Sequence, residues 1–161
     1  MDKLRIDSTV VASNIASPSD SQILNDGVRV LSRHLAKSKD MTGKKVRFTD
    51  QRKASKSLAF QIFNAKKAEK EALYPQLLAL VRIVLKQVDK ALLQFKTGSA
   101  TNPKTQSWIK DVEHYQALTL KVVDQTVRRV IDKESVPSSE KVISLLEEHS
   151  DIIVKGYRDI Q

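Results

Sequence analysis

The chain has 161 residues, enough for one domain with its own hydrophobic core, and a formal net charge of +9. Four glycines, four prolines and 29% charged residues favour long helices over a turn-rich β fold. The absence of cysteine excludes disulfides, thiolate zinc sites and a cysteine nucleophile. No apolar run reaches the ~18 residues of a membrane span and no apolar signal core follows the N-terminus, so we expect no membrane partner.

The first segment, residues 4–11, is rich in β-branched residues and alternates in part, which predicts a β-strand. Asp7 lies in the middle of this run, where aspartate is disfavoured. Its carboxylate has two interpretations: a ligand of a hard metal ion, or a hydrogen-bonded residue near a strand end.

A helix is predicted after Pro18, with Ser19 or Asp20 as its N-cap, because apolar residues recur at helical spacing up to Leu35. A longer helical region is expected over residues 49–133, which we expect to begin at a Thr49 or Asp50 cap.

Pro75 should break or kink this region, because proline lacks an N–H and clashes with the preceding turn. A new helix is therefore expected over residues 75–95, and Asn102 followed by Pro103 predicts the start of another. We expect these two helices to pack antiparallel, with Trp108 in the core.

The last segment, residues 138–161, contains two short apolar runs separated by charged residues. We interpret the runs as a strand hairpin, with one helix over residues 139–148 as the alternative. The predicted fold class is mostly α with a few short β-strands. The predicted divisions are a first strand and helix of a core (1–39), a basic helical insertion (40–137) and a hairpin that returns to the core (138–161).

Two thirds of the charge excess lies in residues 40–70, which carry nine basic and three acidic side chains. Such a cluster attracts a phosphate backbone, but it is also typical of a solvated helix face that keeps a protein soluble. Charge alone leaves both interpretations open. The DNA-binding candidates are Lys44, Lys45, Arg47, Arg52, Lys53, Lys56, Lys66, Lys67 and Lys70.

The sequence lacks the motifs of several enzyme classes. There is no Gly-rich phosphate loop, no Gly-x-Ser-x-Gly elbow and no paired-histidine zinc pattern, since His34, His114 and His149 are scattered. A single aspartate does not make a two-metal site by itself.

Two stretches of the sequence resemble a known family. The first reads Leu4-Arg5-Ile6-Asp7-Ser8-Thr9-Val10-Val11, then Asn14-Ile15, Pro18-Ser19-Asp20-Ser21 and Asp26-Gly27-Val28-Arg29. It resembles the opening of the catalytic domain of DDE-type bacterial insertion-sequence transposases, above all the ISNCY-like group. Residues 140–145 followed by 151–156 are similar to the hairpin that follows the helical insertion of this family.

The resemblance implies a partial ribonuclease H-like catalytic domain with a large helical insertion, in a family that cleaves DNA and transfers strands during transposition. Asp7 would be the first catalytic acid of the Asp-Asp-Glu triad and a ligand of Mg2+ or Mn2+. Thr9, Asn14, Asp20 and Ser21 would support the site. The basic cluster would contact transposon-end and target DNA, in the bacterial cytoplasm at the nucleoid, with a homo-oligomer as an open alternative.

The family pattern is incomplete in this chain. Its second Asp and its Glu have no counterpart here, and only six residues precede Asp7, where the family has a helix-turn-helix region. We therefore expect a truncated transposase that is inactive by itself. The alternative is a small non-catalytic helical protein that binds nucleic acid or a partner through the basic cluster.

Overall fold

The computed structural model describes residues 19–97, 102–136 and 142, and most of these are helical. The α-helices of this part of the chain are α2 (Asp20–Ala36), α3 (Ser38–Thr42), α4 (Arg52–Asn64), α5 (Lys67–Thr97) and α6 (Pro103–Thr126). A π-helical turn, η1 (Val127–Ile131), continues α6. No described helix combines the length and the apolar character needed to cross a bilayer.

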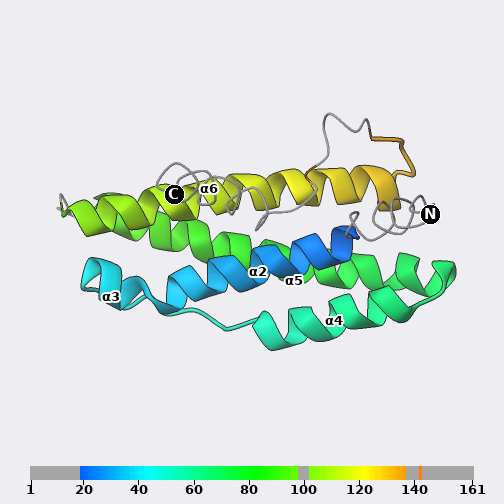
Figure 1. Ribbon diagram of the computed structural model, residues 1–161, viewed down its shortest axis with the longest axis horizontal. Helices are drawn as coiled ribbons and strands as arrows, with labels where there is room; N and C mark the ends of the chain where they lie inside the picture. Colours follow the sequence, from blue (N-terminus) through cyan, green and yellow to red (C-terminus); the bar gives the residue numbers. More distant parts are fainter. Residues whose placement is uncertain (1–18, 98–101, 137–141, 143–161) are drawn as a thin grey trace, which may run out of the picture.

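The four longer helices form an up-and-down bundle (Figure 1). Successive helices α2, α4, α5 and α6 run in alternating directions, as the order of colours along each ribbon shows. α2 contacts the other three, and α4 and α6 lie on opposite sides of the pair formed by α2 and α5. The predicted antiparallel packing of α5 against α6 is therefore confirmed.

Two of the predicted helix starts are confirmed by their capping groups. Ser19 caps α2 in a capping box, because its Oγ accepts the N–H of Gln22 and the Gln22 side chain accepts the N–H of Ser19. Asn102 caps α6 by accepting the N–H of Lys104 at 2.8 Å, with Pro103 in the first turn. α4 begins differently: Gln51 is the cap residue and makes no side-chain capping bond.

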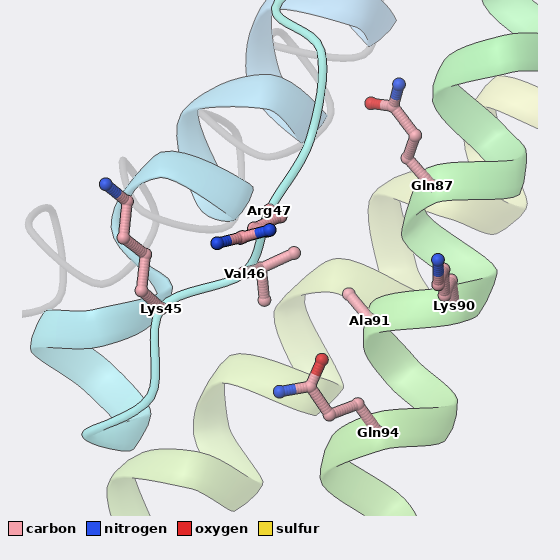
Figure 2. Close-up of a pocket in the computed structure, with 7 residues that line it drawn as sticks. All are labelled: Lys45, Val46, Arg47, Gln87, Lys90, Ala91 and Gln94. Atoms are coloured by element: carbon pink, nitrogen blue, oxygen red, sulfur yellow. The ribbon is translucent and has the colours of Figure 1, made fainter.

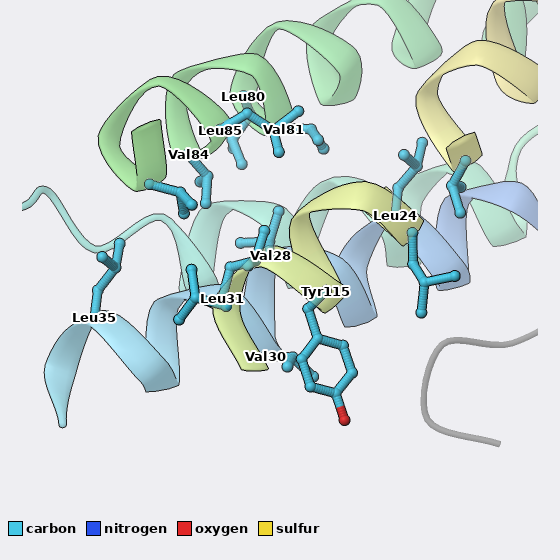
Figure 3. Close-up of a cluster of buried hydrophobic side chains, with 14 of the residues drawn as sticks. Leu24, Val28, Val30, Leu31, Leu35, Leu80, Val81, Val84, Leu85 and Tyr115 are labelled. Carbon is cyan, nitrogen blue, oxygen red and sulfur yellow. The ribbon is translucent and has the colours of Figure 1, made fainter. Parts of the chain in front are cut away.

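The core fills the space between α2, α5 and α6 (Figure 3). Side chains from α2 and α5 face one another in this view, and Tyr115 of α6 lies beside Val30 of α2. Trp108 is 1% exposed and its indole N–H donates to the backbone oxygen of His34 at 2.9 Å. The prediction that Trp108 is a core residue is therefore confirmed, and its polar atom has the partner that a buried indole needs.

The predicted start of a new helix at Pro75 is wrong. α5 continues through Pro75, and the break falls ten residues earlier, where Ala65 is extended between α4 and α5. Pro75 lies on the exposed side of α5, whereas its neighbour Tyr74 and the following Leu77 are buried. Burial on both sides of the proline offsets the missing hydrogen bond, which by itself disfavours a helix by roughly 3 kcal/mol.

The prediction of a ribonuclease H-like domain is also wrong. That fold needs a central β-sheet, and no residue within 19–97 or 102–136 is part of a strand. α2, predicted as part of a sheet-containing core, instead packs against α4, α5 and α6. Ten of its 17 residues are buried, so the helix has no apolar face left for a sheet.

Several predictions fall on residues that the structure does not describe. The strand over residues 4–11 lies outside the described residues, and so does the hairpin within 138–161 apart from Val142. The described parts of the predicted divisions 1–39 and 40–137 share one hydrophobic core.

Candidate nucleic-acid interface

The linker between α3 and α4 places cationic side chains at the surface in an alternating pattern. Gly43 ends α3 with a φ of +81°, a conformation that favours glycine, and the chain then becomes extended. Val46 and Phe48 face the core, while Lys45 and Arg47, which precede them, are exposed. Alternation of this kind follows from the twofold side-chain period of an extended chain.

The linker is also fixed in place by a hydrogen bond. The backbone N–H of Val46 donates to the Oγ of Ser38 at 3.0 Å, and both residues are buried. The exposed cations on either side of Val46 therefore project from an anchored backbone.

Arg52 differs from the other cations because its charge is already neutralised. Its guanidinium donates to both carboxylate oxygens of Asp50, with Nε 3.0 Å from Oδ1 and Nη2 2.7 Å from Oδ2. These hydrogen bonds lower the pKa of the Asp50 carboxyl and raise the pKa of the Arg52 guanidinium. Asp50 also accepts the backbone N–H of Arg52, so this pair stabilises the start of α4 rather than presenting a free cation.

The outer face of α4 combines positive charge with two exposed aromatic rings. Phe60 is 69% exposed and Phe63 is 62% exposed, whereas Ile62 between them is buried. Lys53 and Lys56 are exposed on the preceding turns, and α4 contains no acidic residue. Residues three and four apart share one face of a helix, so Lys56, Phe60 and Phe63 lie on the same side. We call Lys53, Lys56, Phe60 and Phe63 the α4 face.

The remaining predicted cations extend this surface. Lys44 in the linker, and Lys66 and Lys67 at the junction of α4 and α5, are exposed, and Lys70 in the first turns of α5 is half-buried. Apart from Arg52, none of the nine predicted DNA-binding residues forms an ion pair with a described residue. The structure therefore places the predicted cations along one continuous stretch that runs from the linker through α4 to the start of α5.

A pocket of about 330 Å³ lies between the linker and α5 (Figure 2). The buried side chains of Val46 and Ala91 form its apolar part. Gln87 and Gln94 extend from α5 toward the linker, and Arg47 lines the pocket from the linker side.

Asp20 and Ser21, predicted to support a catalytic site, are part of a buried polar cluster at the start of α2. Asp20 Oδ1 accepts from Gln125 at 2.8 Å, and Oδ2 accepts from Arg129 at 2.9 Å. Ser21 is fully buried and hydrogen-bonds with Ser19 at 2.9 Å. These contacts tie α2 to the end of α6, so they have a structural role whatever else they do.

The predicted catalytic and metal residue Asp7 lies outside the described residues, together with Thr9 and Asn14. Within the described ranges, no group of three or more histidine or carboxylate side chains is arranged to hold a metal ion. Both carboxylate oxygens of Asp20 are engaged by protein donors. The Mg2+ or Mn2+ site therefore stays a prediction that rests on Asp7 alone.

Sequence reasoning missed four residues of this surface: Phe60 and Phe63 on α4, and Gln87 and Gln94 in the pocket. The two phenylalanines carried a signal, since they lie off the apolar stripe that contains Ile62 and follow Lys56 at helical spacing. The glutamines carried none, because the linker that faces them is some 40 residues away in the sequence.

Comparison of the chain with protein-family models, with curated proteins and with solved structures finds no match.

Proposed function

We propose that this protein is a non-catalytic helical protein that binds single-stranded nucleic acid along the α4 face and the adjoining linker. The observation that carries the proposal is the pair of exposed phenylalanines, Phe60 and Phe63, set among cations that have no ion-pair partner in the described structure. Cationic side chains track a phosphate backbone, and exposed aromatic rings stack on bases.

The aromatic rings favour a single strand over a duplex. Bases in a duplex are stacked on one another and are not available to a ring on a helix surface, whereas unpaired bases present their faces. Rings three residues apart on α4 lie on the same side and can take neighbouring bases.

The charge distribution disfavours a second copy of the chain as the occupant of this face. The α4 face carries two cations, Lys53 and Lys56, and no acid, so two α4 faces would repel each other on contact. A polyanion instead gains from the same charges, because binding releases its counterions.

The interpretation as a truncated transposase stays a prediction, and it has less support than the sequence alone suggested because the predicted ribonuclease H-like fold is wrong. It rests on the resemblance of residues 4–31 and 140–156, and its first acid, Asp7, lies outside the described residues. DNA as a partner is common to both interpretations, and only the non-catalytic one can do without a sheet-based active site.

The test is fluorescence anisotropy with a labelled single-stranded oligonucleotide and with the duplex of the same sequence. The chain should bind the single strand more tightly, and each of Phe60→Ala and Phe63→Ala should weaken binding by about 5- to 150-fold, the equivalent of about 1–3 kcal/mol per stacked base. Both rings are exposed, so the variants should unfold at nearly the same temperature as the parent chain.

Leu120→Ala is the matched control, since Leu120 is an exposed apolar residue on α6, away from the basic stretch. This variant should bind the single strand like the parent chain. Unchanged binding after loss of both phenylalanines, or a preference for the duplex, would contradict the proposal. Loss of a dimer in the phenylalanine variants without loss of nucleic-acid binding would identify the α4 face as a self-association surface instead.

A further inference from the structure

The pocket between the linker and α5 has walls that are held in place without a ligand. The linker wall is anchored by the hydrogen bond from Val46 to Ser38 and by the packing of Phe48 against the core. The opposite wall is a continuous stretch of α5 that contains Gln87, Ala91 and Gln94. A site built on anchored elements needs little rearrangement to bind.

The described residues that line the pocket carry positive charges only. Lys45 and Arg47 come from the linker and Lys90 from α5, and none of the described lining residues is acidic. None of the three forms an ion pair with a described residue. Asp89, the neighbour of Lys90, is hydrogen-bonded to Gln116 of α6. The pocket is therefore suited to a ligand that carries negative charge.

The amides of Gln87 and Gln94 indicate that the ligand also carries hydrogen-bonding groups. The Oε1 atom of Gln87 is buried and has no hydrogen-bond partner within the described residues. An acceptor in that state is unfavourable. Because Gln87 lines the pocket, a rotation of its amide would bring Oε1 to a donor on a bound ligand. Glutamine amides offer both donors and acceptors, which is how they recognise the edges of nucleobases.

We propose that this pocket binds a nucleotide. The base lies against Val46 and Ala91 and hydrogen-bonds with Gln87. The sugar hydroxyls hydrogen-bond with Gln94, about two helical turns further along α5, and the phosphate contacts Arg47 and Lys90. The volume of about 330 Å³ is at the small end of the range for small-molecule sites, roughly 300–1,000 Å³. The ligand could be a free mononucleotide or one nucleotide of a strand bound along α4, since both have this chemistry. Only the second possibility depends on the function proposed above.

The first experiment titrates the full chain with the 5′-monophosphates of adenosine, guanosine, cytidine and uridine. Binding is measured by calorimetry, and the side-chain amide signals of Gln87 and Gln94 are followed by NMR. At least one nucleotide should bind and shift both amide signals, and the matching nucleoside and inorganic phosphate should each bind about tenfold more weakly or worse. Equal binding of phosphate and nucleotide would reduce the pocket to a general anion site and overturn the proposal, and so would the absence of amide shifts.

Two variants separate binding from folding. Gln87→Met keeps the length of the side chain and removes the unpartnered acceptor, so it should weaken nucleotide binding by about tenfold or more while leaving thermal stability unchanged or higher. Arg47→Gln should weaken the nucleotide and affect the nucleoside little, because Arg47 is assigned to the phosphate. Lys121→Gln on α6 makes the same change of charge far from the pocket and should have no effect. Nucleotide binding that survives both Gln87→Met and Arg47→Gln would overturn the assignment.

A third comparison distinguishes this proposal from the function proposed above. The Phe60→Ala/Phe63→Ala double variant should retain mononucleotide binding, since neither ring lines the pocket. An unlabelled single strand that displaces the mononucleotide from the parent chain would identify the strand as the natural source. Mononucleotide binding by a chain that binds no strand would leave the pocket established and contradict only the proposed function.

Discussion

Arg129 and Asp20, 109 positions apart in the chain, form an ion pair of 2.9 Å between Nη1 and Oδ2. The pair joins the first turn of α2 to the π-helical turn that follows α6. The Asp20 side chain is only 4% exposed, whereas that of Arg129 is 41% exposed. Gln125, one helical turn before Arg129, donates to the other carboxylate oxygen, so both oxygens of Asp20 are satisfied by residues at and just beyond the end of α6.

We expect Asp20→Ala to lower the free energy of unfolding by about 2–4 kcal/mol, because it removes the carboxylate that Arg129 pairs with and one of the two acceptors of Gln125 Nε2, the other being the backbone oxygen of Val142. Urea denaturation followed by circular dichroism measures this. Asp26→Ala on the same helix is the control, since the pair of Asp26 with Arg29 is partly exposed and should contribute less than about 1 kcal/mol. Equal losses of unfolding free energy in the two variants would show that the contacts of Asp20 with Gln125 and Arg129 add little to stability.

Pro75→Ala should stabilise the protein. The substitution restores a backbone N–H inside α5 and removes a ring that clashes with the preceding turn, which is expected to add about 1–3 kcal/mol. Thermal denaturation would show this as a higher midpoint. A lower midpoint would mean that the packing of Tyr74 and Leu77 depends on the local geometry at the proline.

Trp108→Phe should destabilise the bundle by about 1–2 kcal/mol, because the carbonyl of His34 loses its indole donor while most of the ring packing is kept. Trp108→Ala should have a larger effect, about 3–5 kcal/mol, since it also leaves a cavity beside Phe95. Both are measured by circular dichroism, because Trp108 is the only tryptophan and the variants lose its fluorescence. A similar loss of unfolding free energy in the two variants would mean that the packing of the Trp108 ring contributes little to stability.

Stability should fall at alkaline pH through Tyr74 and Tyr115. Burial raises the pKa of both phenols above the ordinary value near 10. An acid whose pKa is raised in the folded state keeps its proton to a higher pH there than in the unfolded state. The contribution of these phenols to stability is therefore complete below about pH 10 and is lost as the pH rises through the folded-state pKa. Urea denaturation at a series of pH values tests the direction, and absorbance near the phenolate band follows ionisation. A Tyr74→Phe variant should show a smaller decline, and an identical decline would remove Tyr74 as a cause.

The salt dependence of nucleic-acid binding should separate Lys56 from Arg52. Lys56→Gln should lower the slope of log affinity against log salt by about 0.7, the value for one phosphate contact with a single strand. The charge-neutral double variant Asp50→Asn/Arg52→Gln should leave the slope nearly unchanged, because the two groups already neutralise each other. A larger effect from the double variant than from Lys56→Gln would contradict this distinction.

Local patterns predicted the helices well where their own residues supply the stabilising groups. The Ser19 cap, the Asn102 and Pro103 start and the burial of Trp108 all follow from short-range spacing and chemistry. Pro75 shows the limit of such rules, since its local penalty is outweighed by the burial of side chains on either side. The same limit applies to Asp20, whose partners Gln125 and Arg129 are more than a hundred residues away.

The net charge and its concentration in residues 40–70 were determined by the sequence alone, and so was the helical character of most of the chain. Only the tertiary structure decided how these features are used. Packing buried α2 among three helices and excluded the predicted sheet, and it left Phe60 and Phe63 exposed beside the lysines of α4. It also brought the linker against α5 to form the pocket. The reason is physical: charge and helical propensity belong to each residue, whereas burial and pairing depend on which surfaces the whole chain covers.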